Sequence, residues 1–295
     1  MDEFALINAI VKALGDRAVG DWVRVGPGDD AAVIAASEHH DIVSSIDTLV
    51  EGVHFPAQAP ADLIGYRALM VSLSDLAAMA AVPRYVLVGI TIPAIDDGWA
   101  VALATGMRRA AQRCDVYVCG GNIAQGPLTI TVSVHGEVRS GKALLRNAAR
   151  IGDGIFVSGP LGGAAACVRT ESFELESDVL EPMQQAYYRP TARFDLGEDI
   201  RAHANSGIDV SDGLLQDLGH VLSASGVGAR LVSTSIPICP GALLEDALHG
   251  GDDYELLCTA RQLPSFVRIG EIVAGSGIRL DDEEIDPRGF NHFIA

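Results

Sequence analysis

Hydrophobic and polar positions follow two different periods along the chain, and together they predict a mixture of helices and strands. Apolar residues recur every three or four positions over residues 2–14, which predicts an amphipathic helix. Longer apolar segments predict further helices over 61–80, 97–113, 161–170, 178–188, 191–204 and 214–225. Short runs rich in Val and Ile predict strands over 41–48, 85–92, 115–119, 128–138, 154–158 and 229–235, a strand entering 208–213, and a turn followed by a strand over 250–260.

This mixture occurs in both halves of the chain, which indicates an α/β or α+β fold with two domains. A length of 295 residues also favours about two domains. The run GKALLRNAARIGD at 141–153 is interpreted as the connector. We therefore expect an N-terminal domain over residues 1–140 and a C-terminal α/β domain over residues 150–295.

The charge of the chain argues against two classes of binding partner. Asp and Glu total 39 against 21 Lys and Arg, a formal net charge of −18. Such a surface repels nucleic acids and anionic membranes, so we expect neither as a partner. It repels ATP as well, and a function on phosphates would need metal cations between the carboxylates and the nucleotide. Solubility alone is the other explanation of this charge.

Cysteine usage and the N-terminal segment predict a cytoplasmic protein. The five cysteines are widely spaced and form no CxxC pair, which fits a reducing compartment. The N-terminal segment lacks the basic start and the unbroken apolar run of a signal peptide. The most apolar stretch, residues 68–92, is interrupted by Asp75, Pro83 and Arg84. It therefore predicts a buried helix and a strand, not a membrane span.

Five segments place Asp beside Gly or Ser: GPGDDAAV, SSIDTLVEGVHF, SLSDLAAM, IDVSDGLLQDLGH and GGDDYE. One such pair is usually only a turn. Asp47, Asp75 and Asp209, however, stand among apolar neighbours, where an unpaired carboxylate is costly. Mg²⁺ takes oxygen ligands and is often shared between carboxylates and substrate phosphates. These acids therefore indicate a magnesium-dependent nucleotide site.

Glycine pairs supply positions where the backbone could approach phosphate oxygens closely. They occur as GPG at 26–28 and as GG at 120–121 and 250–251. The chain has no GxxxxGK[ST] and no GxGxxG, which argues against a P-loop or a dinucleotide fold. It also has no GxSxG or HExxH motif, so the sequence does not support a hydrolase or metalloprotease function. His54 is a candidate substrate contact, with a purely structural role as the alternative.

Seven motifs occur in a fixed order, and together they identify a family. They are GPGDDAAV, SSIDTLVEGVHF, PADLIGYRALMVSLSDLAAMAAVP, GGNIAQGPLTITVSVHG, YYRPTAR, IDVSDGLLQDLGH and GGDDYELL. This set resembles the thiamine-monophosphate kinase family, which belongs to a superfamily with aminoimidazole ribonucleotide synthetase and selenophosphate synthetase. The resemblance implies a homodimer in which the N-terminal sheets pair. It also implies that ATP and thiamine phosphate meet in a cleft near the interface, to which the C-terminal domain contributes.

The resemblance also implies roles for individual residues. Expected Mg²⁺ ligands are Asp30, Ser45, Ile46 through its carbonyl, Asp47, Asp75, Asn122, Asp209 and Asp212. Expected ATP contacts are Gly121, Asn122, Arg146 and Ser211, and expected substrate contacts are His54 and Asp252. Four positions depart from the family: Asn122 replaces a common Asp, Ile46 a Thr, Asp252 a Glu and Pro287 an aromatic residue, with Phe290 and Phe293 nearby.

The expected reaction moves the γ-phosphoryl group of ATP onto thiamine phosphate. A phosphate monoester has a second pKa near 6, so the acceptor is mostly a dianion at neutral pH and needs no general base. Several Mg²⁺ ions and Arg146 are expected to offset the repulsion between the two polyanions during in-line transfer. The alternatives are another ATP-using enzyme of the superfamily, or a catalytically silent nucleotide-binding protein.

Overall fold

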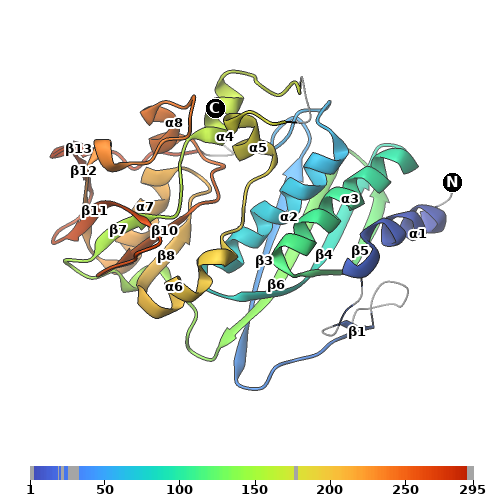
Figure 1. Ribbon diagram of the computed structural model, residues 1–295, viewed down its shortest axis with the longest axis horizontal. Coiled ribbons are helices and arrows are strands. Elements are labelled where there is room, and N and C mark those ends of the chain that lie inside the picture. The colour runs from blue at the N-terminus through green and yellow to red at the C-terminus, as the bar shows by residue number, and fades with distance from the viewer. Residues whose placement is uncertain (1–2, 19, 21–22, 26–32, 176–178, 291–295) are drawn as a thin grey trace. The chain divides into compact units, whose positions relative to one another are not determined.

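The structure, a computed structural model, describes residues 3–18, 20, 23–25, 33–175 and 179–290. The chain divides into two compact units. Unit 1 comprises the described residues up to 76 together with 81–141, and unit 2 comprises 77–80 and the described residues from 142 onward. Each unit combines helices with a sheet (Figure 1). The predicted mixed α/β class is therefore confirmed.

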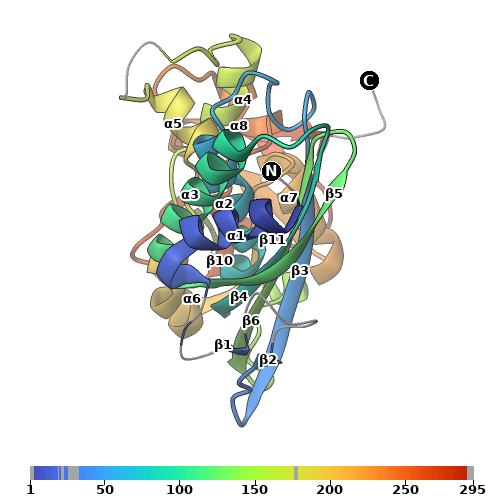
Figure 2. The same ribbon diagram turned by 90° about the vertical axis from the view of Figure 1, so that its right-hand side faces the viewer.

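Unit 1 is built on a four-stranded sheet that two helices cover on one face (Figures 1 and 2). The strand order is β3 (His40–Val50), β6 (Thr129–Arg139), β4 (Val82–Ile92) and β5 (Tyr117–Gln125). β6 runs antiparallel to β3 and β4, and β5 is parallel to β4. The remaining elements are α1 (Glu3–Leu14), η1 (Gly15–Arg17), β1 (Val23–Val25), β2 (Val33–Ile34), α2 (Ala61–Ala78) and α3 (Asp97–Cys114).

The two helices that cover this sheet touch through glycines. A Cβ atom at Gly65 of α2 would lie 2.1 Å from the carbonyl oxygen of Leu103, and one at Gly106 of α3 would lie 1.8 Å from that of Asp62. Backbone therefore meets backbone at this crossing, which only glycine permits. This packing buries α2 almost completely, in agreement with its prediction as a buried helix.

The alternation of side chains along β3 gives the sheet two different faces. Ser45 and Asp47 lie on the face that α2 covers, and Ile42 and Ile46 lie on the opposite face. Ile42 is 62% exposed and Ile46 is 64% exposed. The exposed face thus carries large apolar side chains, although strands that face water usually place polar residues there.

Unit 2 is built on a seven-stranded sheet of order β13-β12-β9-β11-β7-β10-β8. Neighbouring strands are antiparallel except for β9 and β12, which are parallel. The strands are β7 (Gly154–Val157), β8 (Ala204–Asp209), β9 (Gly228–Leu231), β10 (Leu256–Ala260), β11 (Val267–Val273), β12 (Ile278–Leu280) and β13 (Glu283–Ile285). The helices are η2 (Arg146–Ala148), α4 (Gly163–Arg169), α5 (Pro182–Tyr188), η3 (Phe194–Leu196), α6 (Gly197–His203), α7 (Leu214–Ser225), η4 (Ser233–Ser235) and α8 (Leu244–His249).

The central strands of this sheet are buried on both faces. Ile155 and Leu257 belong to a core that includes the apolar residues of α7. Phe156 and Leu256, which point the other way, belong to a second core with Ile200 of α6. A strand that is buried on both faces reads as a continuous apolar run, and this explains why GIFV and LLCTA show no alternation.

The strand predicted over 115–119 is longer than expected. GGNIAQ continues the strand, and β5 ends only at Gln125. The glycines are needed because the neighbouring strand is close: a Cβ atom at Gly121 would lie 2.0 Å from the carbonyl oxygen of Val88. A strand bulge occurs at the same place, between Val86 and Leu87 of β4. These glycines therefore permit close strand packing and do not reverse the chain.

Other predicted boundaries in the second half also differ. The helix predicted over 191–204 is η3 followed by the short α6, and β8 already begins at Ala204. The strand predicted over 229–235 ends at Leu231 and continues as η4. The hydrophobic pattern did not predict α8, β11, β12 or β13. These elements are short, so they contain too few residues to show a helical or strand period. Within the described part of the chain, no helix has the length and apolar character of a membrane span.

Candidate active site

An acidic cluster in unit 1 joins β3 to α2. The Ser45 hydroxyl donates a hydrogen bond of 2.5 Å to Oδ2 of Asp75, which lies on the face of α2 toward β3. Burial raises the pKa of Asp47 to about 6, and the charge of Asp75 adds to this rise, whereas a hydrogen bond with Ser72 acts in the opposite direction. Two carboxylates that were far apart in the sequence therefore repel each other at close range.

The donor atoms of this cluster suit a hard divalent cation. Asp47, Asp75 and Ser45 offer only oxygen atoms, and the charge of Asp75 adds to the burial that raises the pKa of Asp47. A cation between the two carboxylates would remove that repulsion, and Mg²⁺ prefers such ligands. Within the described residues, no group of three or more His, Cys, Asp or Glu side chains is arranged so that it could hold a metal ion. Asp30, a further predicted ligand, lies outside the described residues.

The structure separates Asn122 from this cluster. The strand register places Asn122 of β5, Gly89 of β4, Thr131 of β6 and Thr48 of β3 side by side across the sheet. Thr48 is two residues from Ile46 on β3, so its side chain lies on the same face as that of Ile46. Asn122 therefore lies on the exposed face of the sheet, with the side chain of Ile46, while Asp47 lies on the covered face. β3 and β5 are also the two edge strands of the sheet. Within one unit, Asn122 and its neighbour Gly121 do not join the Asp47–Asp75 pair.

His54 lies in the turn that follows β3, and its ring is held by the backbone. Nδ1 accepts a hydrogen bond of 3.0 Å from the Val50 N–H, and the His54 N–H donates one of 2.9 Å to the Val50 carbonyl oxygen. Because Nδ1 is an acceptor, Nε2 carries the proton of the neutral ring. The imidazole is thus fixed at the end of β3, with Nε2 as its donor.

A second cluster of predicted site residues surrounds the loop between β8 and α7 in unit 2. Asp209 ends β8 and is 4% exposed. Asp217, from the first turn of α7, accepts hydrogen bonds on Oδ2 from the N–H groups of Ser211, Asp212 and Gly213, at 3.0, 3.0 and 3.2 Å. Burial raises the pKa of Asp217 to about 6, against the effect of these donors. Asp217 therefore fixes the loop that carries Ser211 and Asp212.

Sequence reasoning missed Asp217, although one signal was available. The residue lies in IDVSDGLLQDLGH between apolar neighbours, as Asp75 does in its own helix. An acid at such a place in the first turn of a helix favours contact with unpaired N–H groups. Sequence alone does not distinguish an acid that holds a loop in this way from an acid that binds a metal ion.

The C-terminal part of the described chain packs against the same loop. The Phe290 N–H donates to the carbonyl oxygen of Asp212 at 2.8 Å, and Gln216 donates from Nε2 to Oδ2 of Asp212 at 2.9 Å. A Cβ atom at Gly219 would lie 3.1 Å from Pro287, so Pro287 rests on α7. Residues 287–290 thus border the loop, and Phe293 lies outside the described residues.

The structure places Arg146 away from that loop. The carbonyl oxygen of Arg146 accepts a hydrogen bond of 2.9 Å from Ser225, the last residue of α7. Ser211 and Asp212 precede the first residue of the same helix, whose 12 residues span about 18 Å. Arg146 is exposed, and its backbone lies at the opposite end of α7 from Ser211, with which it was expected to bind ATP, and from the expected metal ligand Asp212.

The GGDDYE segment, in contrast, lies directly against the loop. The Asp252 N–H donates to the carbonyl oxygen of Ser211 at 2.8 Å, and the Tyr254 N–H donates to that of Val210 at 2.8 Å. A Cβ atom at Gly251 would lie 2.2 Å from the same Ser211 oxygen, so this approach requires glycine. The structure therefore brings Ser211, Asp212 and Asp252 together in unit 2.

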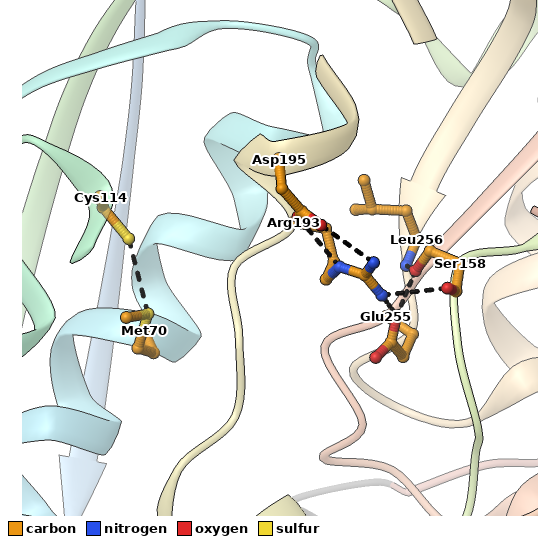
Figure 3. A network of polar contacts seen from close by, with 7 residues as sticks. All are labelled: Met70, Cys114, Ser158, Arg193, Asp195, Glu255 and Leu256. Carbon is orange, nitrogen blue, oxygen red and sulfur yellow. Dashed lines mark hydrogen bonds and ion pairs between the residues drawn. The ribbon is translucent and has the colours of Figure 1, made fainter. Parts of the chain in front are cut away.

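An ion pair that the sequence analysis did not identify supports this segment (Figure 3). Nη1 of Arg193 contacts Oε2 of Glu255 at 2.6 Å and donates to the Ser158 carbonyl oxygen at 3.0 Å. The Ser158 hydroxyl donates to the same Oε2 atom and accepts the Leu256 N–H at 2.7 Å. Arg193 also holds Asp195 through Nε and Nη2. Arg193 comes from the motif YYRPTAR, whose role the sequence alone did not reveal.

A cavity of about 610 Å³ lies near the same part of unit 2. The described residues that line it are His249, Glu284, Ile285, Asp286, Arg288 and Gly289. Gly289 also approaches the loop, since a Cβ atom there would lie 2.3 Å from the carbonyl oxygen of Asp212. This depression is open to the surface and borders the loop, and no predicted site residue is among the described residues that line it.

Comparisons with known proteins agree on one family. Residues 28–138 match the family described as AIR synthase related protein, N-terminal domain. The chain is 39% identical to thiamine-monophosphate kinase of Salmonella typhimurium, over 82% of this chain and 78% of that protein. It is 32% identical to the Aquifex aeolicus enzyme of the same name, over 99% of this chain and 98% of that one.

Two solved structures are similar over nearly the whole chain. A thiamine-monophosphate kinase from Stenotrophomonas maltophilia has a TM-score of 0.87 at 38% identity and covers 97% of this chain and 98% of that one. A structure described as AaThiL complexed with AMPPCP and TMP has a TM-score of 0.81 at 30% identity and covers 99% and 97%. With relatives this similar over most of its length, the chain belongs to the thiamine-monophosphate kinase family.

Proposed function

We propose that this protein transfers the γ-phosphoryl group of ATP to thiamine monophosphate and so forms thiamine diphosphate. The Asp47–Asp75 pair carries the proposal, because two carboxylates at close range with an adjacent hydroxyl favour a metal-dependent site for phosphates. The names of the relatives support the substrate, and so does the AaThiL complex with AMPPCP and TMP. The same names favour the kinase over other ATP-using enzymes of the superfamily.

The metal ligands remain a proposal. Oxygen atoms that would hold Mg²⁺ come from Asp30, Ser45, the Ile46 carbonyl, Asp47, Asp75, Asp209 and Asp212. Asn122 is proposed as a ligand too, but it lies on the opposite face of the sheet from Asp47, so within one unit its amide oxygen would hold a different ion. Bound there, Mg²⁺ would offset the negative charge of the two phosphate substrates. Among these residues the best supported are Asp47 and Asp75, because both lie beside Ser45 between β3 and α2, and the charge of Asp75 adds to the burial that raises the pKa of Asp47.

The other site residues would bind and orient the two substrates. We propose that Gly121, Asn122, Arg146 and Ser211 contact ATP, and that His54 and Asp252 contact thiamine monophosphate. The acceptor phosphate is mostly a dianion at neutral pH, so no residue of this chain needs to remove a proton from it. Asp217 contributes indirectly, since it fixes the loop with Ser211.

Removal of divalent metal is the direct test of this function. We expect the protein, with ATP and thiamine monophosphate, to form thiamine diphosphate only when Mg²⁺ is present. EDTA should abolish product formation, measured by chromatography, and excess Mg²⁺ should restore it. Full activity in metal-free buffer would contradict the proposal. ATP binding without any product in Mg²⁺ would instead support the silent nucleotide-binding alternative.

We also propose a homodimer that forms through the exposed face of the unit 1 sheet. Ile42, Ile46 and Leu87 lie on that face and are 62%, 64% and 36% exposed. Such a row of apolar side chains favours a partner surface. We expect Ile42→Asp to shift the protein from dimer to monomer in analytical ultracentrifugation. Val168→Asp on α4, where Val168 is 50% exposed, is the matched control and should leave the dimer intact.

Localisation and the excluded partners remain predictions as well. All five cysteines are buried and free, which fits the expected reducing compartment. The formal net charge of −18 still argues against nucleic acid and anionic membranes as partners. We therefore propose a cytoplasmic protein whose partners are ATP, thiamine monophosphate and a second copy of the chain.

A further inference from the structure

The side chain of Tyr254 contacts the proposed substrate residue Asp252. The Tyr254 hydroxyl donates a hydrogen bond of 2.8 Å to Oδ1 of Asp252. Both residues have left-handed backbone conformations, with φ of 76° at Asp252 and 53° at Tyr254. Non-glycine residues rarely adopt such angles, and they persist only where the surroundings hold them. The hydroxyl–carboxylate contact therefore depends on a backbone that is held in place.

Backbone hydrogen bonds hold one side of this segment. Asp252 and Tyr254 donate their N–H groups to the carbonyl oxygens of Ser211 and Val210, and Val210 donates back to the Glu255 carbonyl oxygen at 2.8 Å. The segment is thus attached, at alternate residues, to the loop that carries Ser211 and Asp212. Rotation about the backbone at Asp252 would break these bonds.

Side chains hold the other side of the segment. Asp253 is buried and accepts the Gly162 N–H on both carboxylate oxygens, at 2.8 and 2.9 Å. Glu255 is held by Arg193 and by Ser158, which follows β7 (Figure 3). Asp253 and Glu255 therefore point toward the turn after β7, while Asp252 and Tyr254 are left on the side of the Ser211 loop. This double attachment fixes the two left-handed residues.

We propose that Tyr254 is a positioning residue that orients the carboxylate of Asp252 toward thiamine monophosphate. This inference rests on the proposed function and adds a residue that acts through Asp252. The tyrosine hydroxyl donates a hydrogen bond to Oδ1, which restrains the side-chain torsion of Asp252 and therefore the direction of its carboxylate. A carboxylate suits this substrate, because thiamine offers an amino group and a positively charged ring. The shorter Asp arm makes such orientation important, since it reaches one methylene less far than Glu.

Tyr254→Phe removes only the hydroxyl and tests this role. We expect the KM for thiamine monophosphate to rise about fivefold to tenfold, because a hydrogen bond to a charged group is lost. The KM for Mg-ATP and the Tm should stay within experimental error. In an Asp252→Ala background, Tyr254→Phe should have no further effect, since its partner is then absent.

The control removes a tyrosine hydroxyl elsewhere in unit 2. The Tyr188 hydroxyl donates to the Phe173 carbonyl oxygen at 3.1 Å, so Tyr188→Phe should leave both KM values unchanged. An unchanged KM for thiamine monophosphate in Tyr254→Phe would overturn the inference, and so would an equal rise in both KM values. Equal effects of Tyr254→Phe with and without Asp252 would overturn it too. If the wild-type protein forms no thiamine diphosphate, the proposed function fails and this inference fails with it.

Discussion

Asp47→Asn is expected to lower the rate of thiamine diphosphate formation by about two to three orders of magnitude, the usual loss when one electrostatic group of an active site is removed. The amide keeps the shape of the side chain and one oxygen atom, so the protein should stay folded. The loss arises because an amide dipole attracts a divalent cation far less than a carboxylate does. Steady-state kinetics at saturating Mg²⁺ measure this change.

The same substitution should stabilise the metal-free protein above neutral pH. The pKa of Asp47 is raised from 3.8 to about 6 in the folded state, so the folded protein holds this proton more tightly than the unfolded chain. Stability is therefore lost as the pH rises from about 4 to about 6, by about 2–3 kcal/mol at most. In EDTA, the Asn variant should be more stable than the wild type at pH 8 and nearly equal to it at pH 4.

A control on the same strand separates this effect from general damage to β3. Asp41 also lies in β3, but its carboxylate accepts hydrogen bonds from Ser140 and Gly141, which lower its pKa. Asp41→Asn should leave turnover normal and should give no gain in stability at pH 8. If Asp47→Asn instead melts at a lower temperature and keeps near-normal turnover, Asp47 has only a structural role.

Arg193→Ala should produce a large loss of stability. The side chains of Arg193 and Glu255 are 17% and 16% exposed, so the substitution leaves a mostly buried carboxylate without its cation. Breaking such a pair costs about 3 kcal/mol in the free energy of unfolding. Chemical denaturation of the variant and the wild type measures the difference. Turnover should fall as well, because Glu255 belongs to the segment that carries Asp252.

The pH dependence of this loss has a defined sign. Burial raises the pKa of Glu255, and the charge of Arg193 opposes that rise. Without Arg193 the pKa rises further, so the folded variant favours a protonated Glu255. The deficit in stability should therefore be smaller at pH 5 than at pH 8. A deficit that grows as the pH falls would contradict this explanation.

Two further variants check that the buried pair is the cause. Arg193→Met combined with Glu255→Met removes both charges and keeps apolar volume, so it should be less destabilised than Arg193→Ala alone. Arg288→Ala removes an ion pair with Asp286 in which both side chains are more than 70% exposed. Exposed pairs contribute little, so this control should change stability only slightly.

Local patterns predicted the long elements and part of the site. The helices α1, α2, α3 and α7 lie close to their predicted ranges, because each has a long apolar face with a helical period. Asp47 and Asp75 were singled out because carboxylates among apolar residues need a partner. The structure places them together for the same reason: alternation along β3 points Asp47 toward the helix that carries Asp75.

Residues whose conformation or role depends on a distant part of the chain were predicted less accurately. The pair Gly120–Gly121 has the composition of a turn, yet the closeness of β4 makes it part of a strand. The sequence analysis did not identify Asp217, Arg193 or Glu255. Asp217 binds the backbone of the Ser211 loop, and Glu255 binds both Arg193 and Ser158. No sequence pattern connects these residues to their partners. Their importance is visible only from burial and contact.

Periodicity, motif order and residue type are properties of the chain, and they were enough to predict the fold class, the family and the chemical character of the site. Which of those residues meet depends on the three-dimensional fold. Strand register places Asn122 on the exposed face of its sheet and Asp47 on the covered face, and α7 keeps Arg146 at the far end from Ser211. Pairing between distant segments sets these relations, because hydrogen bonds between strands and burial of apolar faces act across the fold and not along the chain.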